Sequence, residues 1–131
     1  MLHPDQFLVN EAWLVFKLND EPIHAGADGD FDFLALMDAA SCFILSSSTV
    51  PASTAEPSAL ESKRMLKKAK AHKDQLPRTL FIPVGQPAHN LKREAERQGV
   101  TTVSIPEDQL LLFIAEAREG FRERFGHGDA Q

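Results

Sequence analysis

The chain has 131 residues, of which 43% are hydrophobic and 25% charged, the composition of one globular domain, and its length leaves no room for a second domain of ordinary size. The single cysteine, Cys42, excludes an internal disulfide, and the sequence has neither a signal-peptide pattern nor an apolar run of about 20 residues. We therefore expect a single domain over residues 1–131, with a core over about 8–125, a frayed tail over 126–131, a cytoplasmic location and no membrane contact.

The net charge of -5 is unevenly distributed along the chain. Residues 1–56 carry nine acids and one base, a net charge of -8, whereas residues 57–131 carry 13 bases and ten acids, a net charge of +3. An acidic total disfavours non-specific binding to nucleic acid, which depends on phosphate neutralisation. Halves of opposite charge favour complementary contacts within or between molecules.

The first half of the chain predicts a set of strands. Residues 8–18 are apolar on both faces from Trp13 onward, which indicates a strand at the centre of a sheet. A turn or a short return strand follows. Residues 42–49 predict another strand, whose serines suit a sheet edge that faces water.

The second half predicts alternating helices and strands. Ser58 and Glu61 form an S-x-x-E capping box, which starts a helix that extends to about Lys73. A strand over 78–84, a helix over 88–98 that stops at Gly99 and a strand over 100–105 come next. A last helix begins after Pro106, with apolar residues at helical spacing.

Residues 31–38, FDFLALMD, decide between two α/β architectures. A helix there predicts a flavodoxin-like or Rossmann-like three-layer array. A strand gives the order β-β-β-α-β-α-β-α. A short apolar run cannot be assigned from its period, but residues 38–41 form a turn-like segment between two apolar runs, which favours a hairpin.

The order of elements and three local motifs resemble a known superfamily. Residues 36–44 match an I-D-x-x-S hairpin with Asp38 and Ser41, residues 76–82 match a strand that follows a proline, and residues 98–100 match the entry to a last strand. From Trp13 to about Phe121 the chain resembles the ribonuclease H-like catalytic cores of retroviral-type integrases and transposases. The resemblance implies a mixed sheet of three antiparallel and two parallel strands.

The same resemblance implies three catalytic carboxylates, and this chain departs from all three. The positions correspond to Phe16, to the strand end at Val84 and Gly85, and to Leu110, Phe113 and Ile114 of the last helix. Two-metal phosphoryl transfer needs acidic oxygens to hold its cations. We therefore predict a catalytically inactive domain without a cofactor, which acts as a protein-binding or self-associating module.

Two other functions remain open. A metal-dependent nuclease would need Mg²⁺ or Mn²⁺ on atypical carboxylates, for which Glu11, Asp20 and Asp38 are the candidates, although Asp38 also suits a turn cap. A weak nucleic-acid site would use the basic face of residues 63–73. The candidate binding residues are Lys63, Lys67 and Lys70 of that face and Gln86, His89 and Asn90 of the loop after the fourth main strand.

Overall fold

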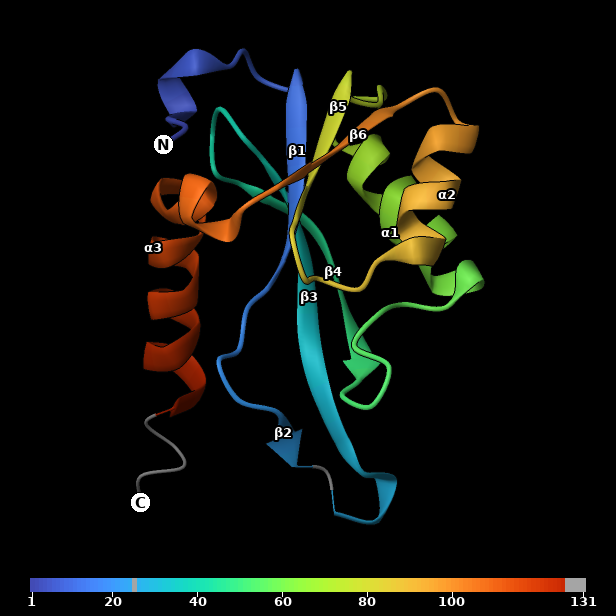
Figure 1. The fold of residues 1–131 in the computed structure, drawn as a ribbon, viewed down its shortest axis with the longest axis vertical. Coiled ribbons are helices and arrows are strands. Elements are labelled where there is room, and N and C mark those ends of the chain that lie inside the picture. Colours follow the sequence, from blue (N-terminus) through green and yellow to red (C-terminus); the bar gives the residue numbers. More distant parts are fainter. Residues whose placement is uncertain (25, 127–131) are drawn as a thin grey trace.

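A single mixed β-sheet forms the middle layer of the protein, with α1 and α2 on one face and α3 on the other (Figure 1). The structure is a computed structural model that describes residues 1–24 and 26–126. The strands are β1 (Ala12–Lys17), β2 (Ile23–His24), β3 (Asp30–Asp38), β4 (Ile44–Pro51), β5 (Thr79–Pro83) and β6 (Thr101–Ile105), and the α-helices are α1 (Ala59–Ala71), α2 (His89–Arg97) and α3 (Leu111–Phe121). Among the described residues, no helix is both long and apolar enough to cross a bilayer.

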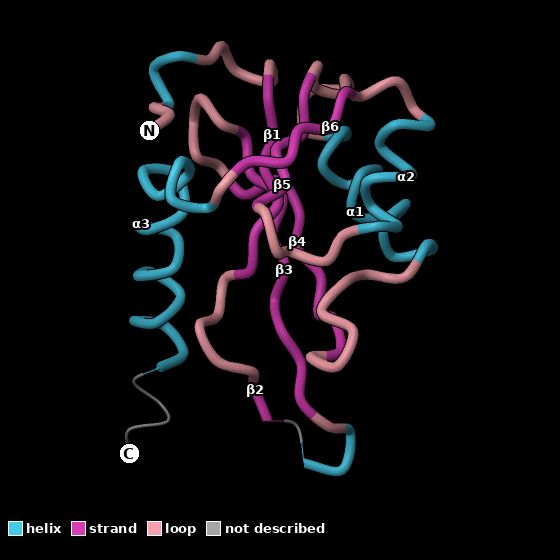
Figure 2. The backbone as a smooth tube through the Cα atoms, in the orientation of Figure 1, coloured by secondary structure: helices cyan, strands magenta, loops and turns pink. Residues whose placement is uncertain are grey.

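The main strands lie in the order β4-β3-β1-β5-β6. β1, β3 and β4 are antiparallel neighbours, whereas β1, β5 and β6 are parallel. The short β2 pairs with the start of β3, at the opposite end of the sheet from the β3–β4 turn (Figure 2). The predicted β-β-β-α-β-α-β-α order is confirmed. The flavodoxin-like alternative is wrong, because residues 31–38 are a strand.

Asp38 organises the turn between β3 and β4. Its carboxylate accepts hydrogen bonds from the Asn10 N–H at 2.7 Å, the Ser41 N–H at 2.9 Å and the Ser41 hydroxyl at 2.7 Å. Cys42 has a φ of 57° and lies in this turn, half-buried, so its expected place on a strand was wrong. The carboxylate satisfies N–H groups that the turn leaves without backbone partners.

Each face of the sheet carries its own apolar cluster. The α1 and α2 side contains Trp13, Leu34, Leu36, Met65, Leu66, Leu80 and Leu91, and the α3 side contains Leu14, Phe16, Met37, Leu110, Phe113 and Ile114. Successive residues of a strand point to opposite faces, so β1 contributes to both clusters. β1 is therefore covered on both sides, as its sequence predicts.

The serines of β4 do not all face water as predicted. The hydroxyl of Ser46 donates to the Met65 carbonyl oxygen at 2.9 Å and that of Ser48 to the Glu61 carboxylate at 3.0 Å, so both are buried under α1. Ser47 faces solvent. The capping role of Ser58 is confirmed, since its hydroxyl accepts the Glu61 N–H at 3.1 Å. Of the predicted frayed tail, residues 127–131 lie outside the described residues.

Candidate functional site

The carboxyl ends of β1 and β5 form a small pocket of about 200 Å³. β1 pairs antiparallel with β3 and parallel with β5, so the sheet changes its pairing at this point, where open α/β sheets commonly bind ligands. Phe16 and the Val84–Gly85 turn, two positions at which the resemblance implies catalytic carboxylates, both line the pocket. The full lining is Phe16, Lys17, Pro83, Val84, Gly85, Gln86, Glu107 and Arg118.

The strand residues at this pocket supply no oxygen ligands from their side chains. Phe16 is fully buried and belongs to the same cluster as Phe113 and Ile114 of α3. Pro83 at the end of β5 is also buried, and Val84 is exposed. The side chains that would have to project carboxylates toward a cation are therefore hydrocarbon.

An ion pair between Arg118 and Glu107 lies in the lining of the pocket. The Arg118 Nε–H of α3 donates to the Lys17 carbonyl oxygen at 2.9 Å, and Arg118 Nη2 lies 2.5 Å from Glu107 Oε1. Glu107 is the one carboxylate in the pocket lining, and the guanidinium neutralises it. A pair of divalent cations needs several uncommitted carboxylate oxygens, so these residues do not fit that group.

The three candidate metal ligands are all engaged in other contacts. Glu11 accepts the Leu8 N–H at 2.9 Å, Asp20 pairs with Arg122 at 2.9 Å, and Asp38 holds the β3–β4 turn. Within residues 1–24 and 26–126, no group of three or more histidine, cysteine or acidic residues is placed to hold a metal ion. Each of the three carboxylates has a structural partner instead.

The loop after β5 is held by contacts to the β4–α1 connection. Gln86 donates to the Ala55 carbonyl oxygen at 3.1 Å, and the Asn90 side chain donates to the Pro57 carbonyl oxygen at 3.1 Å. The Asn90 N–H near the start of α2 donates to the Glu56 carboxylate at 3.1 Å, so that carboxylate caps the helix from outside. Two of the three predicted loop residues thus join segments of the fold, whereas His89 is exposed beside a pocket of about 170 Å³.

The basic face predicted on α1 is present and exposed. Lys63, Lys67 and Lys70 are exposed, while Met65 and Leu66 pack against the sheet. Residues 58–98, which include α1 and α2, carry ten bases and four acids, a net charge of +6. This side of the molecule is therefore the positive one.

Glu94 of α2 is a buried acid within the basic layer formed by α1 and α2. Hydrogen bonds from Arg97 and Gln98 lower the pKa of the Glu94 carboxyl, and the nearby charges of Arg97 and Lys63 act in the same direction against the effect of burial. Gln98 Nε2 donates to Glu94 at 2.9 Å, as does Arg97 Nε. The carboxylate thus fixes the last turn of α2.

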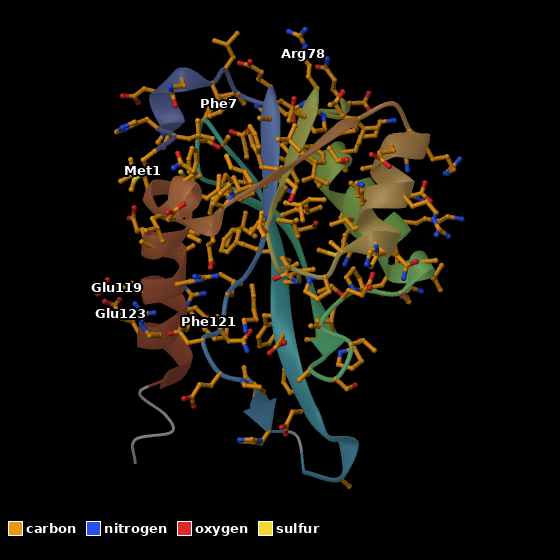
Figure 3. The ribbon with its side chains drawn as sticks, in the orientation of Figure 1. Met1, Phe7, Arg78, Glu119, Phe121 and Glu123 are labelled. Atoms are coloured by element: carbon orange, nitrogen blue, oxygen red, sulfur yellow. The ribbon has the colours of Figure 1, made fainter. Side chains whose placement is uncertain are left out.

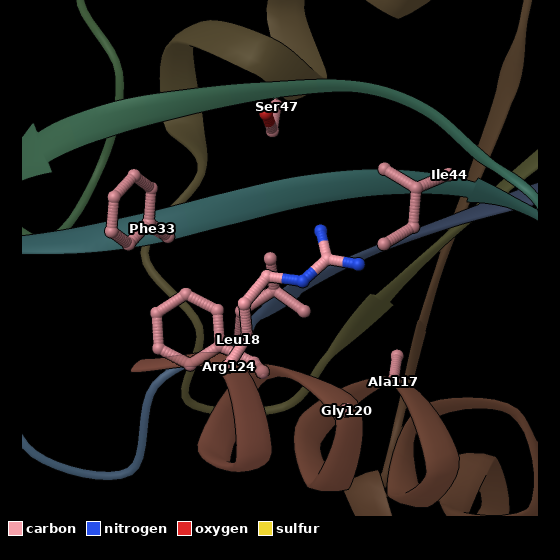
Figure 4. Close-up of a pocket in the computed structure, with 8 residues that line it drawn as sticks. Leu18, Phe33, Ile44, Ser47, Ala117, Gly120 and Arg124 are labelled. Carbon is pink, nitrogen blue, oxygen red and sulfur yellow. The ribbon is translucent and has the colours of Figure 1, made fainter. Parts of the chain in front are cut away.

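A groove lies between α3 and the face of β4 that is turned toward it. Figure 4 shows Phe33 and Ser47 on the sheet side, opposite Ala117 and Gly120 of α3, around a pocket of about 370 Å³. A second pocket of about 430 Å³ shares Ile44 and Ala117 with the first. The groove exists because α3 packs over β1 and β3 and leaves the neighbouring face of β4 uncovered.

Cys42 borders the second pocket as a half-buried thiol. Burial raises the pKa of the Cys42 thiol, and the negative charges of Glu116 and Asp38 raise it further. The reactive thiolate is therefore disfavoured.

Comparison with known proteins supports the fold and extends no further. No sequence family and no curated protein matches this chain. Among solved structures, the HTLV-2 integrase catalytic core with magnesium in its dimeric form matches with a TM-score of 0.57 and 11% identity over 89% of this chain and 70% of that one. The BIV integrase core matches with a TM-score of 0.56 and 16% identity over 93% and 74%. A chain of the simian T-cell lymphotropic virus intasome, solved in complex with the PP2A regulatory subunit B56 gamma, matches with a TM-score of 0.58 and 13% identity over 89% of this chain and 40% of that one.

The chain has the ribonuclease H-like fold of retroviral integrase catalytic cores. The resemblance to integrase catalytic cores that the sequence indicated is therefore confirmed at the level of the fold. This protein covers only 40% of the length of the matched intasome chain. Identities of 11–16% carry neither the activity nor the partners of those proteins.

Sequence reasoning missed the Arg118–Glu107 ion pair and the groove. Arg118 lies four residues after the inward-facing Ile114, and this spacing places it on the same face of α3. A cation on the buried face of a helix is a signal that an anionic or carbonyl partner lies beneath it. The groove left no signal, because it depends on where α3 packs.

Proposed function

We propose that this chain is a catalytically inactive ribonuclease H-like domain that acts by binding protein chains, copies of itself included. The observation that carries the proposal is the lining of the pocket at the ends of β1 and β5. Phe16 lies in this lining where the resemblance implies a carboxylate, and Arg118 neutralises Glu107, the one carboxylate in the lining. Two-metal phosphoryl transfer would need several uncommitted carboxylates there.

Two further observations support a role in protein binding. The chain exposes an apolar groove between β4 and α3, and exposed apolar surface of this kind is typical of interaction sites. Charge is also separated between the layers: Glu119 of α3 and Glu123 of the helical turn that follows it project outward (Figure 3), on the side opposite the basic α1 and α2 layer. The HTLV-2 core has been solved in dimeric and trimeric forms, so the fold accommodates assembly.

Titration with Mg²⁺ and Mn²⁺ tests the inactive site. A metal that binds the native state must raise the unfolding temperature, so we expect no shift with either ion and no metal-dependent cleavage of single- or double-stranded DNA. The matched control is an Arg118→Ala protein, in which Glu107 keeps its carboxylate but loses its ion pair. If this variant also shows no shift, the pocket lacks metal ligands and is not merely blocked by the ion pair. Metal-dependent cleavage by the unmodified chain, lost on adding a chelator, contradicts the proposal.

A second function, binding of nucleic acid, is favoured by the exposed lysines of α1 alone. We expect any duplex binding to fall steeply with salt and to be lost in a Lys67→Glu, Lys68→Glu protein. An Arg122→Glu, Arg124→Glu protein changes the net charge equally on the α3 side and serves as the control. Fluorescence anisotropy with a labelled duplex measures the salt dependence of binding and the affinity of each variant.

A further inference from the structure

The outer edge of β4 is the surface that carries a further inference. β4 pairs with β3 on one side, and its other side faces no strand among the described residues. Residues 39–55 contain no charged side chain. Natural sheet edges are commonly protected by charges, prolines or bulges, and residues 46–50 of this edge contain none of the three.

The direction of the backbone groups follows from the register. Pro51, which has no N–H, is paired with Phe31, and the adjacent Ala52 N–H donates to the Asp30 carbonyl oxygen at 2.9 Å. Backbone groups of alternate strand residues point to the same side, so Thr49 and Ser47 point outward as Pro51 does. Both residues are exposed, and the loop and turn hydrogen bonds of the described chain use neither N–H.

The usable edge ends at a defined residue on each side. A register shift between Leu36 and Met37 makes Leu45 a bulge residue, and the Leu45 carbonyl oxygen is bonded to His72 Nε2 at 2.9 Å. At the other end Pro51 offers no N–H, and its carbonyl oxygen already accepts the Ala55 N–H at 2.8 Å. The open segment is therefore Ser46–Val50.

We infer that β4 pairs antiparallel with β4 of a second copy of this chain, about a two-fold axis at Ser48. This register sets Ser47 opposite Thr49 of the second copy, and Thr49 opposite its Ser47. Two outward N–H groups and two outward carbonyl groups of each copy then meet partners. The inference rests on the proposed function and names its partner and surface.

The two ends of the segment fit this register. Leu45 comes opposite Pro51 of the second copy, and the Leu45 carbonyl, occupied by His72, meets the residue that has no N–H to give. A partner strand with ordinary residues would leave a donor unpaired at that point. The pairing is isologous, so it closes as a dimer and does not extend into a filament.

The acidic side chain bonded to this edge has a partner of opposite charge. Glu61, which accepts the Ser48 hydroxyl, is paired with Arg64 at 3.5 Å on the same helix. Serine and threonine side chains across a strand pair add favourable contacts.

Concentration-dependent amide exchange, measured together with mass by sedimentation, tests the inference. We expect a dimer in which the Ser47 and Thr49 amides become at least tenfold slower to exchange as concentration rises. The Ser48 and Val50 amides, already bonded to β3, are slow at every concentration. A monomer throughout the accessible concentration range, or a dimer in which the Ser47 and Thr49 amides stay fast, overturns the inference.

A pair of matched variants adds an independent readout. Thr49→Lys places lysines of the two copies close together and should shift the protein to monomer, whereas Ser104→Lys, at an exposed site on the opposite edge strand β6, should leave the dimer intact. A dimer that survives Thr49→Lys overturns the inference. Nuclease assays on the same samples separate the dimer inference from the proposed function. A monomer without nuclease activity contradicts the dimer but not the proposal that the domain is inactive. A dimer with nuclease activity contradicts only the proposal that the domain is inactive.

Discussion

Arg118 shows how a single residue defines the chemistry of a pocket. Its side chain is only 20% exposed, and its guanidinium bonds both the carbonyl oxygen of Lys17 and the Glu107 carboxylate. Without these two acceptors a buried cation would cost several kcal/mol. The ion pair therefore locks α3 onto the end of β1 at the place where a catalytic site would need open carboxylates.

Removing the Arg118 side chain should destabilise the protein measurably. Arg118→Ala breaks a charge-assisted hydrogen bond and leaves Glu107 without its partner, for an expected loss of about 2 kcal/mol in the free energy of unfolding. Arg122→Ala breaks only the exposed pair with Asp20, worth about 0–1 kcal/mol. Urea unfolding of both variants measures the difference. Equal losses would show that the Arg118 pair is not a buried anchor.

The Asp38 turn gives a second test at the scale of a residue. Asp38→Asn keeps the shape of the side chain but places an NH₂ donor where an oxygen now accepts two bonds from Ser41. We expect a loss of about 1–3 kcal/mol, because buried donors would then face one another. Asp20→Asn, at an exposed carboxylate, should have little effect. Chemical denaturation compares the two, and similar midpoints would contradict the assigned turn role.

Single residues were the least predictable part of the site. Gln86 and Asn90 have side chains typical of ligand-binding loops, yet their partners are carbonyl groups of Ala55 and Pro57, 31 and 33 residues earlier in the chain. Ser46 and Ser48 were expected to face water at a sheet edge, yet their hydroxyl groups bond α1. A polar side chain shows that a partner is needed, and only the fold shows which partner it is.

Among the elements, α2 depends on charge more than on apolar contact. It buries only Leu91, Glu94 and Ala95, and Glu94 anchors its last turn through Arg97 and Gln98. Glu56 caps its start. Each end of this helix therefore relies on a carboxylate.

The stability contributed by Glu94 should depend on pH in a defined direction. Its pKa is lowered in the folded state, so the contribution is present above the ordinary value of 4.5 and is lost as the pH falls through the folded value. Wild type should therefore unfold at higher urea than Glu94→Gln at pH 7, and the two midpoints should converge in acid. Glu119→Gln, on exposed α3, is the control and should show no such convergence. A gap between wild type and Glu94→Gln that persists in acid contradicts the role of the ionised carboxylate.

The elements themselves were largely predictable, for physical reasons that differ between strands and helices. β1 was identifiable because Trp13–Leu18 is apolar on both faces, as a covered central strand requires. α1 was identifiable from its Ser58 cap. β3 was ambiguous from its own residues, since a short apolar run suits either structure, and the hairpin turn at Asp38 resolved it.

At the scale of the whole molecule, one sheet connects two apolar clusters. Trp13 lies in the cluster beneath α1 and α2, and Phe113 lies in the cluster beneath α3. β1 supplies Trp13 and Val15 to the first and Leu14 and Phe16 to the second. Adjacent residues of β1 belong to different clusters, so a change that loosens one cluster also shifts the strand that packs against the other. The expected single domain should therefore unfold as one unit.

Phe113→Ala tests this coupling, because it damages the α3 side while Trp13, the only tryptophan, reports on the other side. Truncating a fully buried phenylalanine should cost about 3–5 kcal/mol, whereas Leu112→Ala, at a residue 46% exposed on the same helix, should cost far less. In the Phe113→Ala protein, Trp13 fluorescence and far-ultraviolet circular dichroism should still report one coincident transition in urea, shifted to lower concentration. If the circular dichroism transition came first and the fluorescence midpoint stayed at its wild-type value, α3 and its cluster would be a separate unit, and the sheet would not transmit the loss.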